Sequence, residues 1–238
     1  MNILITGGAS GLGLAITNTL AMHFYEATIY FTYFSSADAA KAVEAKNPNT
    51  KGLFCDFTDE QSLNSLMEFV KENNIEILIN NAFTNLEKCH VHKITRHAYQ
   101  TSFNNDVLTT AMLTGAFIER ARKRKGGRII TILSGVTAQF PPLGWALYAA
   151  SKSYLLSLHS SWASENKGFH ITSNCVSPEF MLTPINDDTD DRIVEQMIAT
   201  HPLKKLLTVE EVAKTVLFLC ESTTHLNGQN ILINAAQY

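Results

Sequence analysis

Short apolar runs alternate with helix-like stretches along the whole chain, and this alternation limits the fold more than any other feature. Seven runs have strand composition with little polar alternation: residues 3–6, 28–33, 52–55, 75–79, 128–133, 170–176 and 230–233. Strands without a polar face are typical of a parallel sheet that helices cover on both faces. Helical patterns occupy residues 12–22, 37–46, 59–73, 96–124, 146–165 and 208–221. The order predicts an α/β fold with a doubly wound, seven-stranded parallel sheet and right-handed crossovers.

The length suits one domain of this kind. The chain has 238 residues, of which 45% are hydrophobic and 17% charged, as in an ordinary globular protein. Because no repeat, low-complexity tract or linker interrupts the pattern, we expect a single domain over residues 1–238. Residues 177–207 form a longer connection than usual, and long connections often serve as active-site lids.

Charge and cysteine content exclude several classes of protein. The net charge is −3 and the pI about 6.2, so we expect no nucleic-acid partner and no attraction to anionic membranes. No apolar run approaches the roughly 20 residues that span a bilayer, and no secretory signal begins the sequence. The four scattered cysteines lack C-x-x-C spacing, which indicates reduced thiols in a cytoplasmic protein.

The first expected strand runs directly into a glycine-rich turn before a helix. The turn reads Thr6-Gly-Gly-Ala-Ser10-Gly11-Leu12-Gly13. Glycines let the backbone turn tightly and approach a pyrophosphate, whose charge then lies at a helix N-terminus. Although the spacing is not the usual G-x-G-x-x-G, its place in a strand–turn–helix unit predicts phosphate binding. The residues expected at this site are Thr6, Gly7, Ser10, Gly11, Leu12 and Gly13.

A second group of residues points to acid–base chemistry. Ser134 ends an expected strand, and Tyr148 and Lys152 stand four residues apart on the following helix, so they share one face. An ammonium beside a phenol favours the phenolate, which would lower the pKa of Tyr148 toward neutrality. On its own, a Tyr-x-x-x-Lys pair is more typical of an ordinary helix surface. The glycine turn favours the catalytic interpretation.

These motifs together resemble the short-chain dehydrogenase/reductase family, in its single-domain, 3-oxoacyl-reductase-like branch. The resemblance rests on Thr6-Gly7-x-x-x-Gly11-x-Gly13, Ser134 and Tyr148-x-x-x-Lys152, and it extends through Asn80-Asn81-Ala82 and Asn174-x-Val176-Ser177-Pro178. It implies a Rossmann-like, NAD(P)-dependent oxidoreductase that transfers hydride to or from a carbonyl carbon. Tyr148 would move the proton, Lys152 would lower its pKa and hold the ribose, and Ser134 would orient the carbonyl. It also implies a homotetramer or dimer built on the helices at 96–124 and 146–165.

The resemblance assigns further cofactor contacts, and the sequence bears on the choice of cofactor. The contacts are Asp56, Phe57, Asn81, Ala82, Phe83, Pro178, Phe180 and Thr183, together with Tyr148 and Lys152. A carboxylate at the end of the second strand would favour NAD(H) by accepting from the ribose 2′-hydroxyl. That place holds Ser35 and Ser36, and the nearest acid is Asp38. The sequence therefore favours NADP(H), with NAD(H) possible.

The chain departs from the family pattern at several positions. Phe83 and Glu179 stand where glycine is usual, Ala235-Ala236 replaces a common Gly-Gly, and Asp106 occupies the place of the active-site asparagine. Asp106 could still hold a relay water and is kept as a catalytic candidate. These departures leave a second hypothesis open, namely an NADP(H)-binding subunit or sensor with little catalysis.

The substrate is expected to be an apolar ketone or a 3-oxoacyl group, as a small molecule or on a carrier protein. Four apolar residues from the expected loops would line its site: Phe140, Trp145, Phe180 and Met181. The alternative is that these side chains are simply packed residues.

Three charged or metal-like clusters have simpler interpretations. Cys89, His90, His92 and His97 lack zinc-site spacing and are interpreted as a polar loop, so no metal is expected. The basic run at 122–125 suits a solvated helix C-terminus. The acidic run at 187–191 lacks the glycine and closing glutamate of a calcium loop and is expected to precede a helix.

Overall fold

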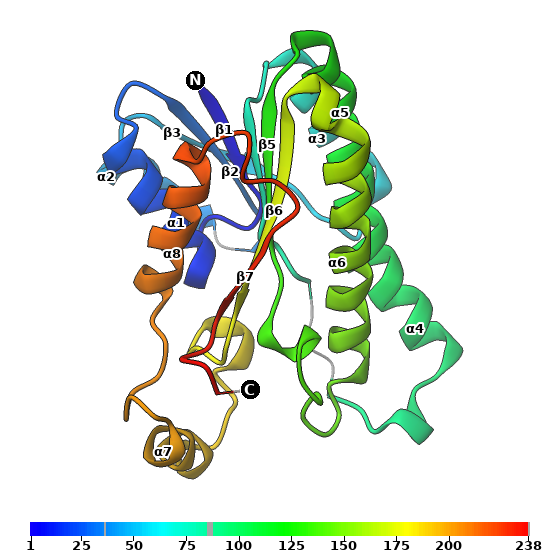
Figure 1. The fold of residues 1–238 in the computed structure, drawn as a ribbon, viewed down its shortest axis with the longest axis vertical. Coiled ribbons are helices and arrows are strands. Elements are labelled where there is room, and N and C mark those ends of the chain that lie inside the picture. The colour runs from blue at the N-terminus through cyan, green and yellow to red at the C-terminus, as the bar shows by residue number, and fades with distance from the viewer. Residues whose placement is uncertain (36, 85–87, 238) are drawn as a thin grey trace.

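A seven-stranded parallel sheet forms the centre of the protein (Figure 1). The structure is a computed structural model that describes residues 1–35, 37–84 and 88–237. All strand pairings are parallel, and the spatial order is β3-β2-β1-β4-β5-β6-β7. The strands are β1 (Asn2–Ile5), β2 (Thr28–Tyr33), β3 (Thr50–Phe54), β4 (Ile77–Asn80), β5 (Gly127–Ile132), β6 (Ile171–Pro178) and β7 (Asn230–Ile233). The predicted doubly wound sheet is confirmed.

Helices cover both faces of this sheet. Figure 1 shows α1, α2 and α8 on one side and α3, α5 and α6 on the other. The helices are α1 (Gly11–His23), α2 (Ala37–Lys46), α3 (Glu60–Glu72), α4 (Arg96–Ser102), α5 (Thr109–Arg124), α6 (Ala146–Asn166), α7 (Asp191–Thr200) and α8 (Val209–Glu221). Within the three described stretches, no helix is both long and apolar enough to cross a bilayer.

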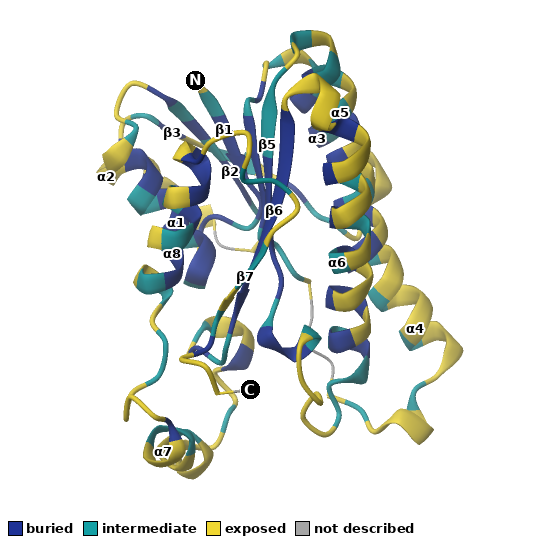
Figure 2. Ribbon diagram, in the orientation of Figure 1, coloured by how far each residue is buried: buried dark blue, intermediate teal, exposed yellow. Residues whose placement is uncertain are grey.

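The double cover explains why the strands lack polar alternation. Ile3 and Ile5 pack in the core beneath α1 and α8, whereas Leu4 points to the opposite core with Phe117. Successive strand residues therefore enter different cores, and both must be apolar. Figure 2 shows the central strands as mainly buried, with exposed residues on the outer faces of the helices.

The helix expected over residues 96–124 is interrupted. A π-helical segment, Phe103–Leu108, separates α4 from α5. The hydroxyls of Thr109 and Thr110 donate to the carbonyl oxygens of Asn104 (2.9 Å) and Asp106 (2.8 Å). These bonds satisfy carbonyls of the widened turn, so the segment can depart from α-helical hydrogen bonding. It places Asp106 on the inner side of the helix, where it is buried.

The segment expected to act as a lid contains α7. The acidic run before it serves the helix N-terminus as expected, because the Asp190 side chain accepts from the Arg192 N–H. Buried Asn186 fixes the start of the segment, donating to the Met181 carbonyl (2.8 Å) and accepting from the Thr183 N–H (2.9 Å). Hydrogen bonds therefore hold this segment, residues 177–207 and called the lid segment below for its expected role, on both sides of Asp187–Asp188.

Candidate active site

A cavity of about 920 Å³ lies at the carboxyl ends of the strands. Its walls come from the turn after β1, the ends of β2 to β6, the start of α6 and the lid segment. Strand order reverses between β1 and β4, and in open parallel sheets ligands bind at such a switch point. The volume suits a dinucleotide with a small substrate beside it.

The turn after β1 requires glycine at three positions. Gly7 has φ +66° and Gly11 has φ +49°, a region that other residues rarely adopt. A Cβ atom at Gly13 would lie 1.9 Å from the Gly7 carbonyl oxygen. The turn is therefore held close against the start of α1, and its backbone faces the cavity.

The N-terminus of α1 fits a phosphate group. Ser10 precedes the helix in extended conformation, and among the described contacts its side chain caps no backbone N–H. The first turn carries no acidic residue. The first backbone N–H groups of a helix lack internal partners and attract anions. Ser10, Gly11 and Leu12, with Gly7 and Gly13, line the cavity here, as a pyrophosphate site requires.

Thr6 supports this turn from beneath, and it lies outside the cavity lining. Its Oγ1 accepts from the N–H groups of Asn81 (2.9 Å) and Ala82 (3.0 Å). The Asn81 side chain donates in return to the carbonyls of Thr6 (2.9 Å) and Gly7 (3.1 Å). The expected direct cofactor contact is thus corrected to a support, because the Thr6 side chain points into the protein and ties the β1 turn to the end of β4.

The ends of β2 and β3 shape the far part of the cavity. Ser35, Asp56 and Phe57 line it as expected, and Phe34 and Thr58 join them. Asp56 Oδ1 accepts from the N–H (2.8 Å) and hydroxyl (2.7 Å) of Thr58, which orients the carboxylate. Ser36, also expected here, lies outside the described residues. Phe34 was missed because an aromatic residue after a strand is commonly a core residue.

Ser134, Tyr148 and Lys152 all line the cavity. Ser134 follows β5, while Tyr148 and Lys152 lie in the first two turns of α6. Burial raises the pKa of Tyr148 above its ordinary value, and a hydrogen bond with Ser134 acts in the opposite direction. The sequence brings these three residues together as predicted.

The effect of Lys152 differs from the expectation. Its side chain is 4% exposed, and Nζ donates to the Ile132 carbonyl oxygen (2.9 Å). Nζ lies 5.7 Å from the centroid of the Tyr148 ring. Burial lowers the pKa of Lys152 to about 8, with Asp106 opposing the change. The expected lowering of the Tyr148 pKa is not produced by the protein's own groups, because burial of the phenol outweighs the Ser134 hydrogen bond.

Asp106 lies behind the cavity wall rather than in it. Its Oδ1 accepts from both the N–H and the hydroxyl of Thr84, each at 2.8 Å. Burial raises the pKa of Asp106, while the Thr84 bonds and the Lys152 charge lower it. Its influence on the site is therefore electrostatic, through Lys152.

Two aromatic rings flank Tyr148. Phe83 meets it edge-to-face with centroids 5.0 Å apart, and Trp145 does the same at 5.5 Å. The Phe83 ring also lies 4.8 Å from Lys152 Nζ. Phe83, at a position where the family pattern has glycine, therefore covers both members of the Tyr–Lys pair.

The substrate end has an apolar wall, but one expected residue is absent from it. Trp145, Phe180 and Met181 line the cavity, as do Pro178 and Thr183. Phe140 is 99% exposed and lies outside the lining, so the expectation for it was wrong. The loop after Ser134 turns its side chain outward, and residue type alone does not report that direction.

The sequence predicts a polar loop at residues 89–97. Its rings at His90 and His92 stack with centroids 6.0 Å apart. Within the described ranges no three His, Cys, Asp or Glu side chains come together as ligands. Nearby, Lys88 pairs with Asp188 (2.7 Å), which joins this loop to the lid segment at the rim of the cavity.

Comparisons with known proteins identify the family. The family model described as Enoyl-(Acyl carrier protein) reductase matches residues 7–235. The 3-oxoacyl-(acyl-carrier-protein) reductase FabG of Escherichia coli (strain K12) is 29% identical over 238 residues, covering 99% of this chain and 96% of the relative. A solved short chain dehydrogenase/reductase family protein is 26% identical, with a TM-score of 0.85 over 100% of this chain and 97% of the other. An actinorhodin polyketide ketoreductase solved with NADPH shares the fold at 19% identity (TM-score 0.88; 100% and 97% covered). This chain therefore belongs to the short-chain dehydrogenase/reductase family of oxidoreductases.

Proposed function

We propose that this oxidoreductase uses NADP(H) to reduce the 3-oxo group of an acyl thioester, with Tyr148 as the proton donor. The observation that carries the proposal is the convergence of Ser134, Tyr148 and Lys152 on one cavity whose other end is the glycine turn. The FabG relative is named as a 3-oxoacyl-(acyl-carrier-protein) reductase, which supports this substrate class and a carrier-linked form of it.

The residues present fit the dinucleotide. The glycine turn and the uncapped start of α1 would hold its pyrophosphate, and Lys152 would hold the ribose next to the nicotinamide. The residues directly after β2 include Ser35 and no carboxylate, which supports a 2′-phosphate and hence NADP(H) over NAD(H). When bound, the dinucleotide supplies the hydride.

The protein's part in the reaction is proton transfer and charge stabilisation. The Ser134 hydroxyl would donate to the carbonyl oxygen and fix its position. As negative charge develops on that oxygen, the Tyr148 hydroxyl would give it a proton, a contribution of roughly 10²–10⁴-fold. With a pKa of about 8, Lys152 is mainly an ammonium at pH 7. That charge would stabilise the tyrosinate left after the transfer.

The decisive experiment pairs binding with turnover. Purified protein should bind NADPH more tightly than NADH by calorimetry and should oxidise NADPH in the presence of acetoacetyl-coenzyme A. Tyr148→Phe should lower kcat at least 100-fold while the NADPH Kd stays within about threefold. Tyr25→Phe is the matched control, since Tyr25 is 75% exposed and lies outside the cavity lining. If Tyr148→Phe keeps more than a tenth of the rate, the assignment of Tyr148 is wrong.

The same assays decide the alternative role as a cofactor-binding subunit. That hypothesis requires NADPH binding without turnover of any carbonyl compound, and steady oxidation of NADPH with one ketone would exclude it. We also propose self-association through α4, α5 and α6, where Tyr99, Phe103, Met112 and Tyr154 are exposed. Light scattering would measure the resulting mass.

A further inference from the structure

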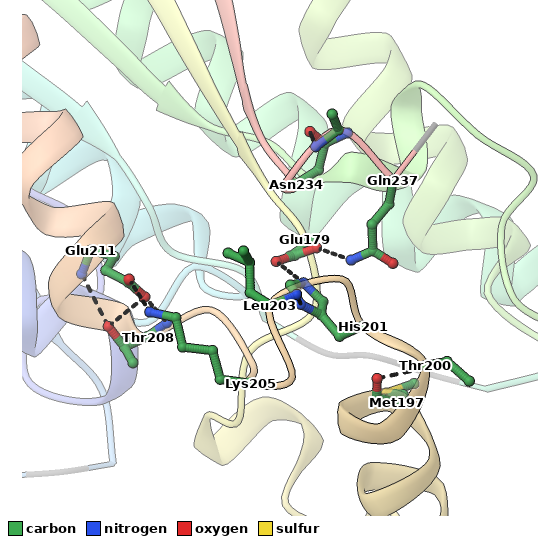
Figure 3. A network of polar contacts seen from close by, with 11 residues as sticks. Glu179, Met197, Thr200, His201, Leu203, Lys205, Thr208, Glu211, Asn234 and Gln237 are labelled. Atoms are coloured by element: carbon green, nitrogen blue, oxygen red, sulfur yellow. Dashed lines mark hydrogen bonds and ion pairs between the residues drawn. The ribbon is translucent and has the colours of Figure 1, made fainter.

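Glu179 joins the cavity wall to two distant parts of the chain (Figure 3). It follows Pro178 at the end of β6 and lines the cavity. Its Oε1 accepts from His201 Nε2 at 3.0 Å, and its Oε2 accepts from Gln237 Nε2 at 2.6 Å. Its backbone N–H donates to the Ile233 carbonyl (2.9 Å). One carboxylate thus connects β6, the end of the lid segment and the C-terminal turn.

His201 is held in one orientation and one tautomer. It is the first residue after α7, it is 5% exposed, and its backbone N–H donates to the Met197 carbonyl (2.9 Å). Its Nδ1 accepts from the Leu203 N–H at 3.0 Å. Because Nδ1 is an acceptor, the ring proton lies on Nε2, which then donates to Glu179. The imidazole therefore bonds to the turn after α7 on one side and to the cavity wall on the other, while the His201 backbone N–H bonds to α7 itself.

The C-terminal turn is shaped to reach the same carboxylate. Ala235 and Ala236 have φ of +47° and +58°, a left-handed conformation that alanine rarely adopts. The Asn234 side chain accepts from the Ala236 N–H (3.2 Å), and the Gln237 N–H donates to the Asn234 carbonyl (3.0 Å). This unfavourable turn brings Gln237 to Glu179, so the second donor is supplied at a conformational cost.

Helix α7 depends on such end contacts because its own packing is light. None of its ten described residues is fully buried. Two of its side chains, Ile193 and Met197, nevertheless line the cavity. At its start, Asp190 caps the helix, but the Lys88–Asp188 pair is largely solvent-exposed and contributes little. The contact between His201 and Glu179 is the buried one, and removing one partner would leave the other group poorly satisfied.

We infer that Glu179 and His201 are positioning residues that hold α7 in place and thereby fix the substrate wall formed by Ile193 and Met197. The inference rests on the proposed function only for the identity of the substrate. Glu179 stands where the family pattern has glycine. Through α7, it would help to bind the part of the acyl chain that extends away from the reacting carbonyl. The turn after β1 and Lys152, which would hold the pyrophosphate and the ribose, lie on other segments, so most of the dinucleotide site does not depend on this contact.

The test combines kinetics with hydrogen exchange on the full chain. In His201→Leu, the KM for a 3-oxohexanoyl thioester should rise at least tenfold, with kcat within about threefold and the NADPH Kd unchanged. The amides of α7 should exchange at least tenfold faster, while those of α8 keep their rates. His201→Gln retains a terminal N–H donor and should recover most of the KM. His225→Leu, which removes an exposed histidine, is the control and should behave as wild type.

Each other outcome also decides the question. Unchanged α7 exchange and KM in His201→Leu would overturn the inference. Glu179→Gln preserves the size of the side chain, but its NH₂ group would face either His201 or Gln237, both of which donate to Glu179. This variant should therefore loosen α7 in the same way. If exchange instead rises in α8 as much as in α7 in both variants, the pair is a general stability element and the inference is wrong. Hydrogen exchange needs no turnover, so it tests the contact between Glu179 and His201 even if the thioester is not a substrate.

Discussion

Replacing Asp106 by asparagine should shift the titration of Lys152 without rebuilding the site. Both hydrogen bonds from Thr84 reach the same oxygen, Asp106 Oδ1. The carbonyl oxygen of an asparagine can accept both bonds, so Asp106→Asn removes the charge while keeping the contacts. The carboxylate is the group that raises the pKa of Lys152 against the effect of burial. Its loss should therefore lower that pKa below about 8.

The size of the shift can be worked from the site. A buried opposite charge commonly changes a pKa by one unit or more, and one unit corresponds to about 1.4 kcal/mol. A one-unit change would bring Lys152 to about 7. At pH 7.5 the ammonium fraction would then fall from about three-quarters to about one-quarter. Because the ammonium stabilises the tyrosinate, kcat/KM at that pH should fall about threefold while the rate at pH 6 changes little.

Isotope-edited NMR of labelled lysine gives the direct measurement, and the pH profile of kcat/KM gives the functional one. The upper limb of the profile should move to lower pH in Asp106→Asn. Asp38→Asn is the control, because Asp38 is fully exposed on α2. If Lys152 titrates at the same or a higher pH in Asp106→Asn, then Asp106 is not ionised near neutrality, and the electrostatic role assigned to it is refuted.

Three further predictions concern stability and cofactor binding. Lys152→Met should stabilise the fold at pH 7 by about 2 kcal/mol in urea denaturation, and lower stability would contradict this. The reason is that lowering the Lys152 pKa from 10.5 to about 8 costs the folded state about 3 kcal/mol. This cost is fully present below pH 8 and disappears above pH 10.5, because the lysine is then neutral in both the folded and the unfolded state. The hydrogen bond from Lys152 to the Ile132 carbonyl offsets part of the cost. Burial lowers the pKa of His159, so stability should fall as pH drops below 6.5. His159→Asn should flatten that dependence between pH 7 and 5, and an unchanged slope would exclude His159 as its source. Phe83→Gly should tighten NADPH binding several-fold by calorimetry, because the Phe83 ring lies against Lys152, the residue that would hold the ribose. The exposed Phe140 gives the control variant, Phe140→Gly, and weaker NADPH binding in Phe83→Gly would contradict the prediction.

The sheet and the central residues of the site could be predicted because local sequence determines them. Apolar runs reflect burial on both faces, and most predicted strands agree with the structure to within two residues. Gly7, Gly11 and Gly13 occupy a turn that other residues cannot form, so the pattern reports the geometry directly. The family relationship follows from the same motifs.

The features that could not be predicted depend on the direction in which a side chain points or on contacts between residues far apart in the sequence. The π-helical segment arises from a hydrogen-bond register that composition does not encode. Phe140 has the right residue type for a substrate wall but points outward. The contacts of Glu179 join residues 22 and 58 positions away, and no local spacing indicates them. The pKa of Tyr148 depends on how burial of the phenol balances the Ser134 hydrogen bond, and residue spacing does not report the extent of burial.

The placement of Trp145 gives the protein a built-in optical reporter. The chain has two tryptophans, and Trp162 packs against the cores beneath α6, away from the cavity lining. Trp145 instead stands at the cavity edge-to-face with Tyr148. Reduced nicotinamide absorbs light in the range where indole emits, so a dinucleotide seated beside Tyr148 would quench this emission by energy transfer. Occupancy of the catalytic end could thus be followed in the unlabelled protein, with Trp162 as an internal reference.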